Sequence, residues 1–112
     1  MPDLSFRVEM AGEVPVVVTP EDIDITNAAA FRTALLEAAG RSRTFVVDMS
    51  RTQFCDTAGI HALVAAHKQA GGDGGDIRLV VTSASVLRIF AITGFDQVIS
   101  SFSRLDQALA TP

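Results

Sequence analysis

The stretch TFVVDMSRTQFCDTAGIHAL, Thr44 to Leu63, decides the fold of this chain. It begins with Thr44–Met49, a short run rich in β-branched residues that is typical of a strand buried on both faces. After the segment SRTQFC the chain enters a predicted helix over about Thr57–Ala70. Strands that alternate with helices form parallel or mostly parallel sheets covered by helices. The stretch therefore predicts an α/β domain with a strand-to-helix joint at Asp56 and Thr57.

The alternation of strands and helices continues on both sides of this stretch. Leu4–Met10 places apolar and polar residues on opposite faces, as in a half-solvated strand, and Ala11–Glu13 turns it into a second, antiparallel strand, Val14–Thr19. The other expected elements are a helix that Thr26 or Asn27 caps and Gly40 ends, a buried strand Ile77–Thr82, a helix from Ser83 or Ser85 to Gly94, a short strand Gln97–Ser100, and a closing helix that Ser103 caps. We expect a single α/β domain, residues 1–112, with a mixed, mostly parallel sheet of about five strands, an N-terminal hairpin and about four helices.

Composition and charge disfavour several classes of protein. The chain has 112 residues, 48% of them hydrophobic, which suffices for one core. A formal net charge of −4 disfavours a nucleic-acid binder, because such domains are usually basic. The single cysteine cannot form an internal disulfide, and the usual zinc spacings are missing. The start resembles no secretory signal, and the apolar runs are far shorter than the ~20 residues of a membrane span. We expect a cytoplasmic domain with no cofactor or metal and no membrane or nucleic-acid partner.

The joint between strand and helix is a candidate functional site. Function in such folds usually lies where the carboxyl end of a strand leads into a helix. Thr57 is expected at or next to the first helical position, where unpaired N–H groups and the helix dipole favour an anion near its hydroxyl. Ala58 and Gly59 leave the first turn almost bare, so that a partner's backbone can approach closely. The same residues also fit a simple N-cap at Asp56 or Thr57, which contributes ~1 kcal/mol.

Four segments in order resemble a known family. Asp56–Ile60, DTAGI, is similar to the Asp-Ser-Ser-Gly-Leu motif of STAS domains, the anti-sigma factor antagonists of bacteria. Val16–Leu35 resembles the family's Gly-Glu-Leu-Asp strand end and first helix, with Asp24 in the place of that Asp. Thr44–Asp56 resembles the third strand and its run-in, and Ser83–Ile99 resembles the third helix with its Thr-Gly-Leu end. The resemblance covers nearly the whole chain, from about Leu4 to Ala110.

This resemblance implies a regulatory switch and not an enzyme. In the family, an ATP-using anti-sigma factor of the serine/threonine kinase type phosphorylates the hydroxyl residue after the motif's Asp, which is Thr57 here. The unphosphorylated antagonist binds that anti-sigma factor and frees the sigma factor, whereas the phosphorylated form lets go. We expect a monomer or weak dimer whose partner-binding residues are Asp24, Asp56, Thr57, Ala58, Gly59 and His61. The alternative is a STAS scaffold or sensor module regulated by a ligand or by redox state.

Several residues depart from the family's pattern or leave alternatives open. Thr57 replaces the more usual Ser, and Ala58 replaces the second Ser. His61 stands where the pattern often has Gly, and it is a partner contact, a cation for phosphothreonine, or a solvated helix residue. His67 lies on the same face of the predicted helix as Ile60, Leu63 and Val64, and it is expected to be partly buried. Cys55 lacks the Arg six residues later that a phosphatase loop requires, so it is a small apolar residue or a redox-sensing thiol.

Overall fold

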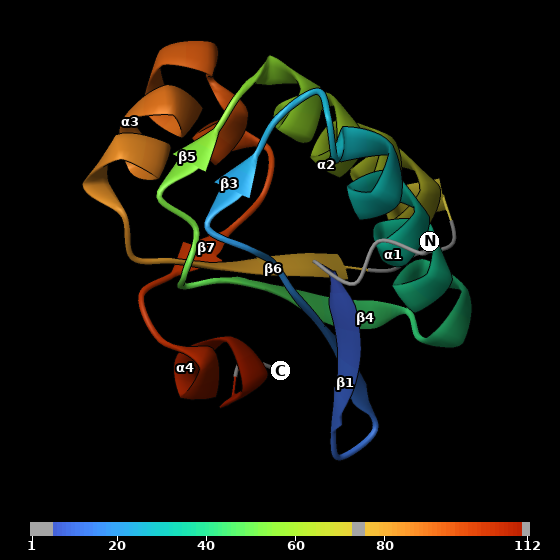
Figure 1. Ribbon diagram of the computed structural model, residues 1–112. Coiled ribbons are helices and arrows are strands. Elements are labelled where there is room, and N and C mark those ends of the chain that lie inside the picture. Colours follow the sequence, from blue (N-terminus) through green and yellow to red (C-terminus); the bar gives the residue numbers. More distant parts are fainter. Residues whose placement is uncertain (1–5, 73–75, 111–112) are drawn as a thin grey trace.

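The computed structural model describes residues 6–72 and 76–110 and shows an α/β domain built on a five-stranded sheet (Figure 1). The strand order is β1-β2-β4-β6-β7, with β1 antiparallel to β2 and the other neighbours parallel. The strands of this sheet are β1 (Arg7–Ala11), β2 (Val14–Val18), β4 (Thr44–Met49), β6 (Asp76–Val81) and β7 (Ser101–Phe102). The helices are α1 (Ala28–Arg41), α2 (Thr57–Gly72), α3 (Ala84–Thr93) and α4 (Leu105–Ala110). The predicted mixed, mostly parallel sheet with an N-terminal hairpin is confirmed.

The sheet separates two hydrophobic cores of different size. Helices α1 and α2 cover one face, and α4 covers part of the other (Figure 1). Val17 and Val47 belong to the larger core under α1 and α2, whereas their neighbours Val16 and Val46 belong to the smaller core, where Ala108 of α4 packs. Because both faces of β2 and β4 are covered, these strands are apolar at successive positions without alternation.

Helix α1 packs on the core through an apolar stripe. Phe31, Leu35 and Ala38 are fully buried, and the ring of Phe31 stacks on that of Phe6 with centroids 5.1 Å apart. Gly40 does not end the helix, however. It lies inside α1, which continues to Arg41 and is closed by the N–H of Ser42 donating to the Ala38 carbonyl at 3.2 Å.

The predicted strand Gln97–Ser100 was wrong. Gly94 ends α3 in the left-handed conformation, with φ of 77°, and the chain continues as a 3₁₀ turn, η1 (Phe95–Gln97). This turn packs the ring of Phe95 edge-on against Phe90, with centroids 4.9 Å apart. The last strand therefore begins only at Ser101, and its pairing with β6 starts where the Ser100 carbonyl accepts from the Leu79 N–H at 3.1 Å. The first strand begins at Arg7, and the residues expected before Phe6 lie outside the described part of the chain.

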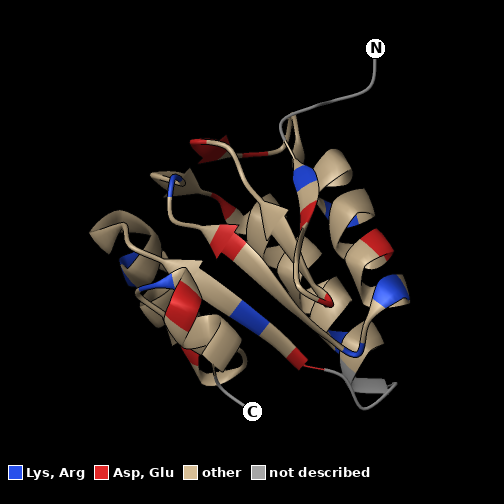
Figure 2. Cartoon of the chain, turned by 90° about the horizontal axis from the view of Figure 1, so that it is seen from below, with Lys and Arg blue, Asp and Glu red and all other residues tan. Residues whose placement is uncertain are grey.

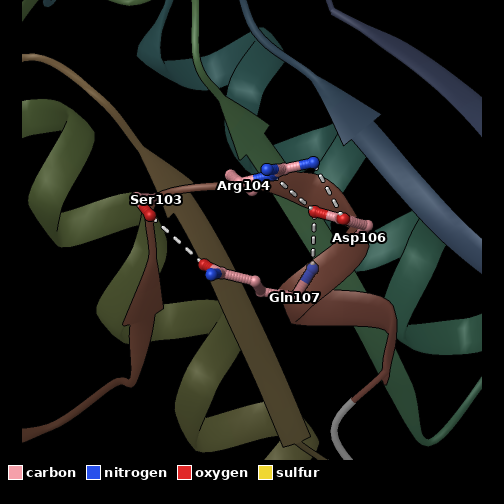
Figure 3. A network of polar contacts seen from close by, with 4 residues as sticks. All are labelled: Ser103, Arg104, Asp106 and Gln107. Carbon is pink, nitrogen blue, oxygen red and sulfur yellow. Dashed lines mark hydrogen bonds and ion pairs between the residues drawn. The ribbon is translucent and has the colours of Figure 1, made fainter.

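Ser103 is not the cap of the closing helix, which begins at Leu105 (Figure 3). The Ser103 hydroxyl donates to Oε1 of Gln107 at 3.2 Å. Arg104 pairs with Asp106 through Nε–Oδ1 and Nη2–Oδ2 contacts of 3.0 and 3.1 Å, and Asp106 Oδ1 also accepts from the Gln107 N–H. These exposed pairs shape the first turn, while the buried Ala108 fixes the helix to the sheet.

Charged residues of both signs are spread over helices, strands and loops (Figure 2). Among residues 6–72 and 76–110, the helices are all too short or too polar to cross a membrane. His67 is partly buried on α2, as its place on the apolar stripe predicted.

Candidate functional site

A second, two-stranded sheet positions the candidate site. Its strands are β3 (Asp22–Ile23) and β5 (Phe54–Cys55), which run parallel between α3 and α2 (Figure 1). Neither segment was predicted as a strand, because two-residue strands are too short to show a period of two in the sequence. Ile23 pairs with Cys55, and the Asp56 N–H donates to the Ile23 carbonyl at 3.1 Å. Parallel strands end at the same edge, so Asp24 and Asp56 follow side by side.

Buried threonines fix the loops that lead into this small sheet. Thr52 Oγ1 donates to the Pro20 carbonyl at 2.6 Å and lies 2.6 Å from Thr19 Oγ1. The Gln53 N–H donates to the Glu21 carbonyl at 2.8 Å. Thr19 and Thr52 are both almost completely buried, so their hydroxyls require these partners. The Pro20 carbonyl and the Thr52 hydroxyl thus join the two loops.

Asp56 is the N-cap of α2, and Thr57 is its first residue. One carboxylate oxygen of Asp56 accepts from the N–H groups of Ala58 at 2.9 Å and of Gly59 at 3.3 Å. The Asp56 carbonyl accepts from the Ile60 N–H at 3.2 Å, the first bond of the helix. Thr57 is exposed. The simple capping role is therefore real, and it belongs to Asp56, which leaves the Thr57 side chain free to face solvent.

Gly59 allows α2 to approach the small sheet closely. A Cβ at this position would lie 2.7 Å from Cys55 Sγ and 2.8 Å from Ile23 Cγ2. Real Cβ atoms do not approach other atoms so closely, and both neighbours are buried. The missing side chain of Gly59 therefore serves internal packing, and the bare outer surface of the first turn comes from Ala58. A contact between Gly59 and a partner stays a prediction.

Asp24 organises the turn that precedes α1. Its carboxylate accepts from the Thr26 N–H at 2.9 Å and makes a short hydrogen bond with the Thr26 hydroxyl. The Thr26 hydroxyl bond, supported by the backbone bond, lowers the pKa of Asp24 below its usual value. Asn27 occupies the N-cap position of α1, as expected, but its side chain turns back to the loop. Its Oδ1 accepts from the Asp24 N–H at 2.9 Å, and its Nδ2 donates to the Asp22 carbonyl at 2.8 Å.

Cys55 lies below this surface and not on it. Its side chain is 2% exposed, and burial, with the nearby charge of Asp56, raises the pKa of the thiol to about 12. A thiol with such a pKa holds its proton at neutral pH, so it is a poor nucleophile and a poor redox sensor. Its packing against Gly59 agrees with the interpretation of Cys55 as a small apolar residue at the joint.

A shallow groove of about 240 Å³ runs between the first turns of α1 and α2. Its floor consists of alanines from both helices, and Arg32 and His61 stand on its rim. His61 is exposed and lies one helical turn after Thr57. Arg32 was not identified from the sequence, because no local pattern connects it to α2. Only the packing of α1 against α2 places Arg32 and His61 at the same groove. The groove extends the surface that carries Asp24, Asp56 and Thr57.

The arrangement defines a class of protein: residues 5–108 match the STAS domain family, and the chain belongs to that family. A STAS-domain containing protein of Pseudomonas aeruginosa strain UCBPP-PA14 is 32% identical over 68 residues, which cover 61% of this chain and 67% of that protein. Among solved structures, an anti-sigma factor antagonist from Mycobacterium paratuberculosis is 28% identical, with a TM-score of 0.84 over 93% of this chain and 89% of that one. The Bacillus cell fate determinant SpoIIAA in its phosphorylated form is 19% identical, with a TM-score of 0.72 over 93% and 96% of the two chains.

Proposed function

We propose that this chain is a cytoplasmic anti-sigma factor antagonist, with residues 1–112 forming one STAS domain and no catalytic activity of its own. It binds an ATP-using anti-sigma factor of the serine/threonine kinase type through a surface defined here as the Thr57 face: Asp24, Asp56, Thr57, Ala58, Gly59 and His61. Phosphorylation of Thr57 ends that binding and thereby leaves the anti-sigma factor free to hold its sigma factor.

One observation carries the proposal: Thr57 is an exposed hydroxyl residue at the first position of α2, next to the paired ends of β3 and β5. A kinase can phosphorylate only a hydroxyl that it can reach. Thr57 meets this requirement, because it is exposed at the start of α2. The structural relative from Mycobacterium paratuberculosis is an anti-sigma factor antagonist, and SpoIIAA has a phosphorylated form, which supports a modifiable surface on this fold.

The local electrostatics explain how a phosphate would act as an off switch. A phosphate adds −1.5 to −2 charges and three acceptor oxygens. The backbone donors nearest to Thr57 at the helix start, the N–H groups of Ala58 and Gly59, are already bonded to the carboxylate of Asp56. The phosphate would therefore point outward to the partner, on the surface where Asp24 and Asp56 follow the paired ends of β3 and β5. A penalty of only ~3 kcal/mol at that contact weakens binding about a hundredfold.

Arg32 adds a positive charge beside the Thr57 face, and His61 adds an imidazole. Both line the groove beside Ala58, and His61 shares the helical face of Thr57. We propose that they bind acidic side chains of the unphosphorylated protein's partner. After phosphorylation, the His61 imidazole lies one helical turn from the phosphothreonine, so the phosphate would compete with the partner for a ring N–H of His61.

The test uses purified protein and each kinase-type anti-sigma factor encoded by the source organism, with binding measured by calorimetry and phosphate located by mass spectrometry. Wild type should bind one of them and gain one phosphate at Thr57 when ATP is added. Thr57→Ala should bind within about twofold of wild type and should not be released by ATP. Thr57→Glu should bind at least tenfold more weakly, because a single carboxylate imitates part of the phosphate charge.

Thr33→Glu is the matched control, because it places the same charge on an exposed threonine of α1, away from the start of the helix. It should bind like wild type. If Thr57→Glu bound the partner as tightly as Thr33→Glu, the phosphate switch would be refuted although the fold is unchanged.

The alternative is a STAS scaffold or sensor module that a ligand or redox state regulates. Regulation by oxidation of Cys55 is disfavoured, because the thiol is buried and its pKa is raised to about 12. Mass spectrometry that finds no phosphate after incubation with every kinase-type anti-sigma factor would favour the ligand-regulated form of this alternative.

A further inference from the structure

A second concave surface lies beside β5, on the side away from β3. It is a pocket of about 320 Å³ between β5 and the first turns of α3. Residues 53–55 form one wall, and Ala84, Ser85, Arg88 and Ile89 form the other. Figure 1 shows β5 and α3 next to each other, and their residues are in contact. The volume lies at the lower end of the range of small-molecule sites.

The walls of the pocket are held in place from outside. On one side, the N–H groups of Gln53 and Phe54 both donate to the Glu21 carbonyl, at 2.8 and 3.3 Å. These bonds fix β5 to the segment that leads into β3. On the other side, Ser83 caps α3 through its hydroxyl, which accepts from the Val86 N–H, and Val86 is buried in the core. The pocket is thus preformed by two elements that are anchored independently, as ligand sites usually are.

The lining combines one aromatic surface with one cation. Phe54 remains 51% exposed although it belongs to a strand, and Ile89 adds a partly buried aliphatic surface beside it. Arg88 is exposed, and among the described residues its guanidinium has neither an ion-pair partner nor a hydrogen-bond partner. The Ser85 hydroxyl and the Gln53 side chain add neutral polar groups at the edge.

From this lining we infer that the pocket is a binding site for a small amphipathic anion, with an aromatic or other apolar body against Phe54 and Ile89 and a carboxylate, sulfonate or similar group at Arg88. The anion satisfies the guanidinium, and the body removes apolar surface of Phe54 from water. The pocket does not include Thr57, so it would bind such an anion whether or not Thr57 is phosphorylated.

The occupant would sit directly behind the Thr57 face. It contacts Cys55 from the pocket side, and the next residue, Asp56, caps α2. The pocket is therefore a place where a small molecule can reach the strand that positions the switch, without covering the switch itself.

The test uses two fluorescent probes that differ in charge: 8-anilinonaphthalene-1-sulfonate and its uncharged analogue N-phenyl-1-naphthylamine. Wild type should bind one equivalent of the sulfonate with a dissociation constant on the order of 10 to 100 µM. Arg88→Gln should weaken the sulfonate about tenfold and leave the uncharged amine unchanged, because only the charged contact is lost. Phe54→Ala should weaken both probes. In amide NMR spectra, the sulfonate should shift Gln53 and Ser85.

Two variants serve as matched controls. Arg32→Gln removes an exposed arginine at the groove between α1 and α2, and Leu36→Ala removes an exposed apolar side chain of α1. Both should bind the two probes like wild type, and unchanged NMR spectra should show that all four variants are folded. Equal effects of Arg88→Gln and Arg32→Gln on the sulfonate would overturn the inference, as would equal losses for both probes with Arg88→Gln. Absence of saturable one-site binding would also overturn it and would leave the pocket as a surface for a protein side chain.

Discussion

The close approach at Gly59 predicts that Gly59→Ala destabilises the domain, contrary to the usual effect of such a change in a helix. Alanine favours helices over glycine by about 1 kcal/mol, and the gain is smaller in the first turn. Against this, the added methyl would lie 2.7 Å from Cys55 Sγ and 2.8 Å from Ile23 Cγ2. Overpacking of a buried site costs about 1–3 kcal/mol. The free energy of unfolding should therefore fall by about 1–2 kcal/mol, and the midpoint of thermal unfolding by about 5 °C or more.

Gly40→Ala is the control, because the two glycines differ in what surrounds them. A Cβ at Gly40 would meet nothing within 4 Å, and the residue lies inside α1. This variant should gain about 0.5–1 kcal/mol in urea denaturation followed by circular dichroism. If Gly59→Ala were as stable as wild type or more stable, the packing of α2 against β3 and β5 would be looser than the geometry implies, and the structural account of this glycine would be wrong.

Three further outcomes follow from the groups around the joint. Asp56→Ala should lower the free energy of unfolding by about 1 kcal/mol in urea, because the N–H groups of the first turn of α2 lose their cap. The free energy of unfolding should fall as pH rises from about 9 towards 12, because folded Cys55 keeps its proton up to a pKa of about 12 while the unfolded thiol loses it. In denaturation at different pH values, Cys55→Ala should therefore show a smaller fall than wild type. Thr26→Ala should raise the pKa of Asp24 towards 3.8, read from its carboxyl carbon in an NMR titration; an unchanged pKa would show that the hydroxyl bond is not its cause.

The fold could be predicted where the pattern runs over several residues and failed where it does not. Both faces of β4 are buried, and its six residues form a mainly apolar run that predicts such a strand. In contrast, β3, β5 and β7 contain two residues each, and their existence depends on backbone pairing with distant segments. Val98 and Ile99 resemble a strand in the sequence, yet the left-handed Gly94 directs this segment into a turn over the core.

The candidate site shows the same division. The resemblance indicated Asp24, Asp56 and Thr57, and the register of β3 and β5 brings their backbones to one edge. Sequence reasoning missed Arg32 and Arg88, since each lines its groove or pocket only through packing against a segment distant in sequence, α2 for Arg32 and β5 for Arg88. A lone arginine on a helix has no local signal that distinguishes a binding residue from a solvated one.

Asp56 connects the stability of α2 with the proposed switch. Its carboxylate holds the N–H groups of Ala58 and Gly59, and it is the negative charge nearest in sequence to the Thr57 hydroxyl. A phosphate on Thr57 would place a second negative group beside Asp56, and their repulsion would weaken a cap that contributes about 1 kcal/mol. The modification would thus change the charge presented at the start of α2, while Gly59 keeps the helix packed on Cys55 and Ile23. The switch would act by adding charge and bulk to the surface that faces the partner, with the backbone in place.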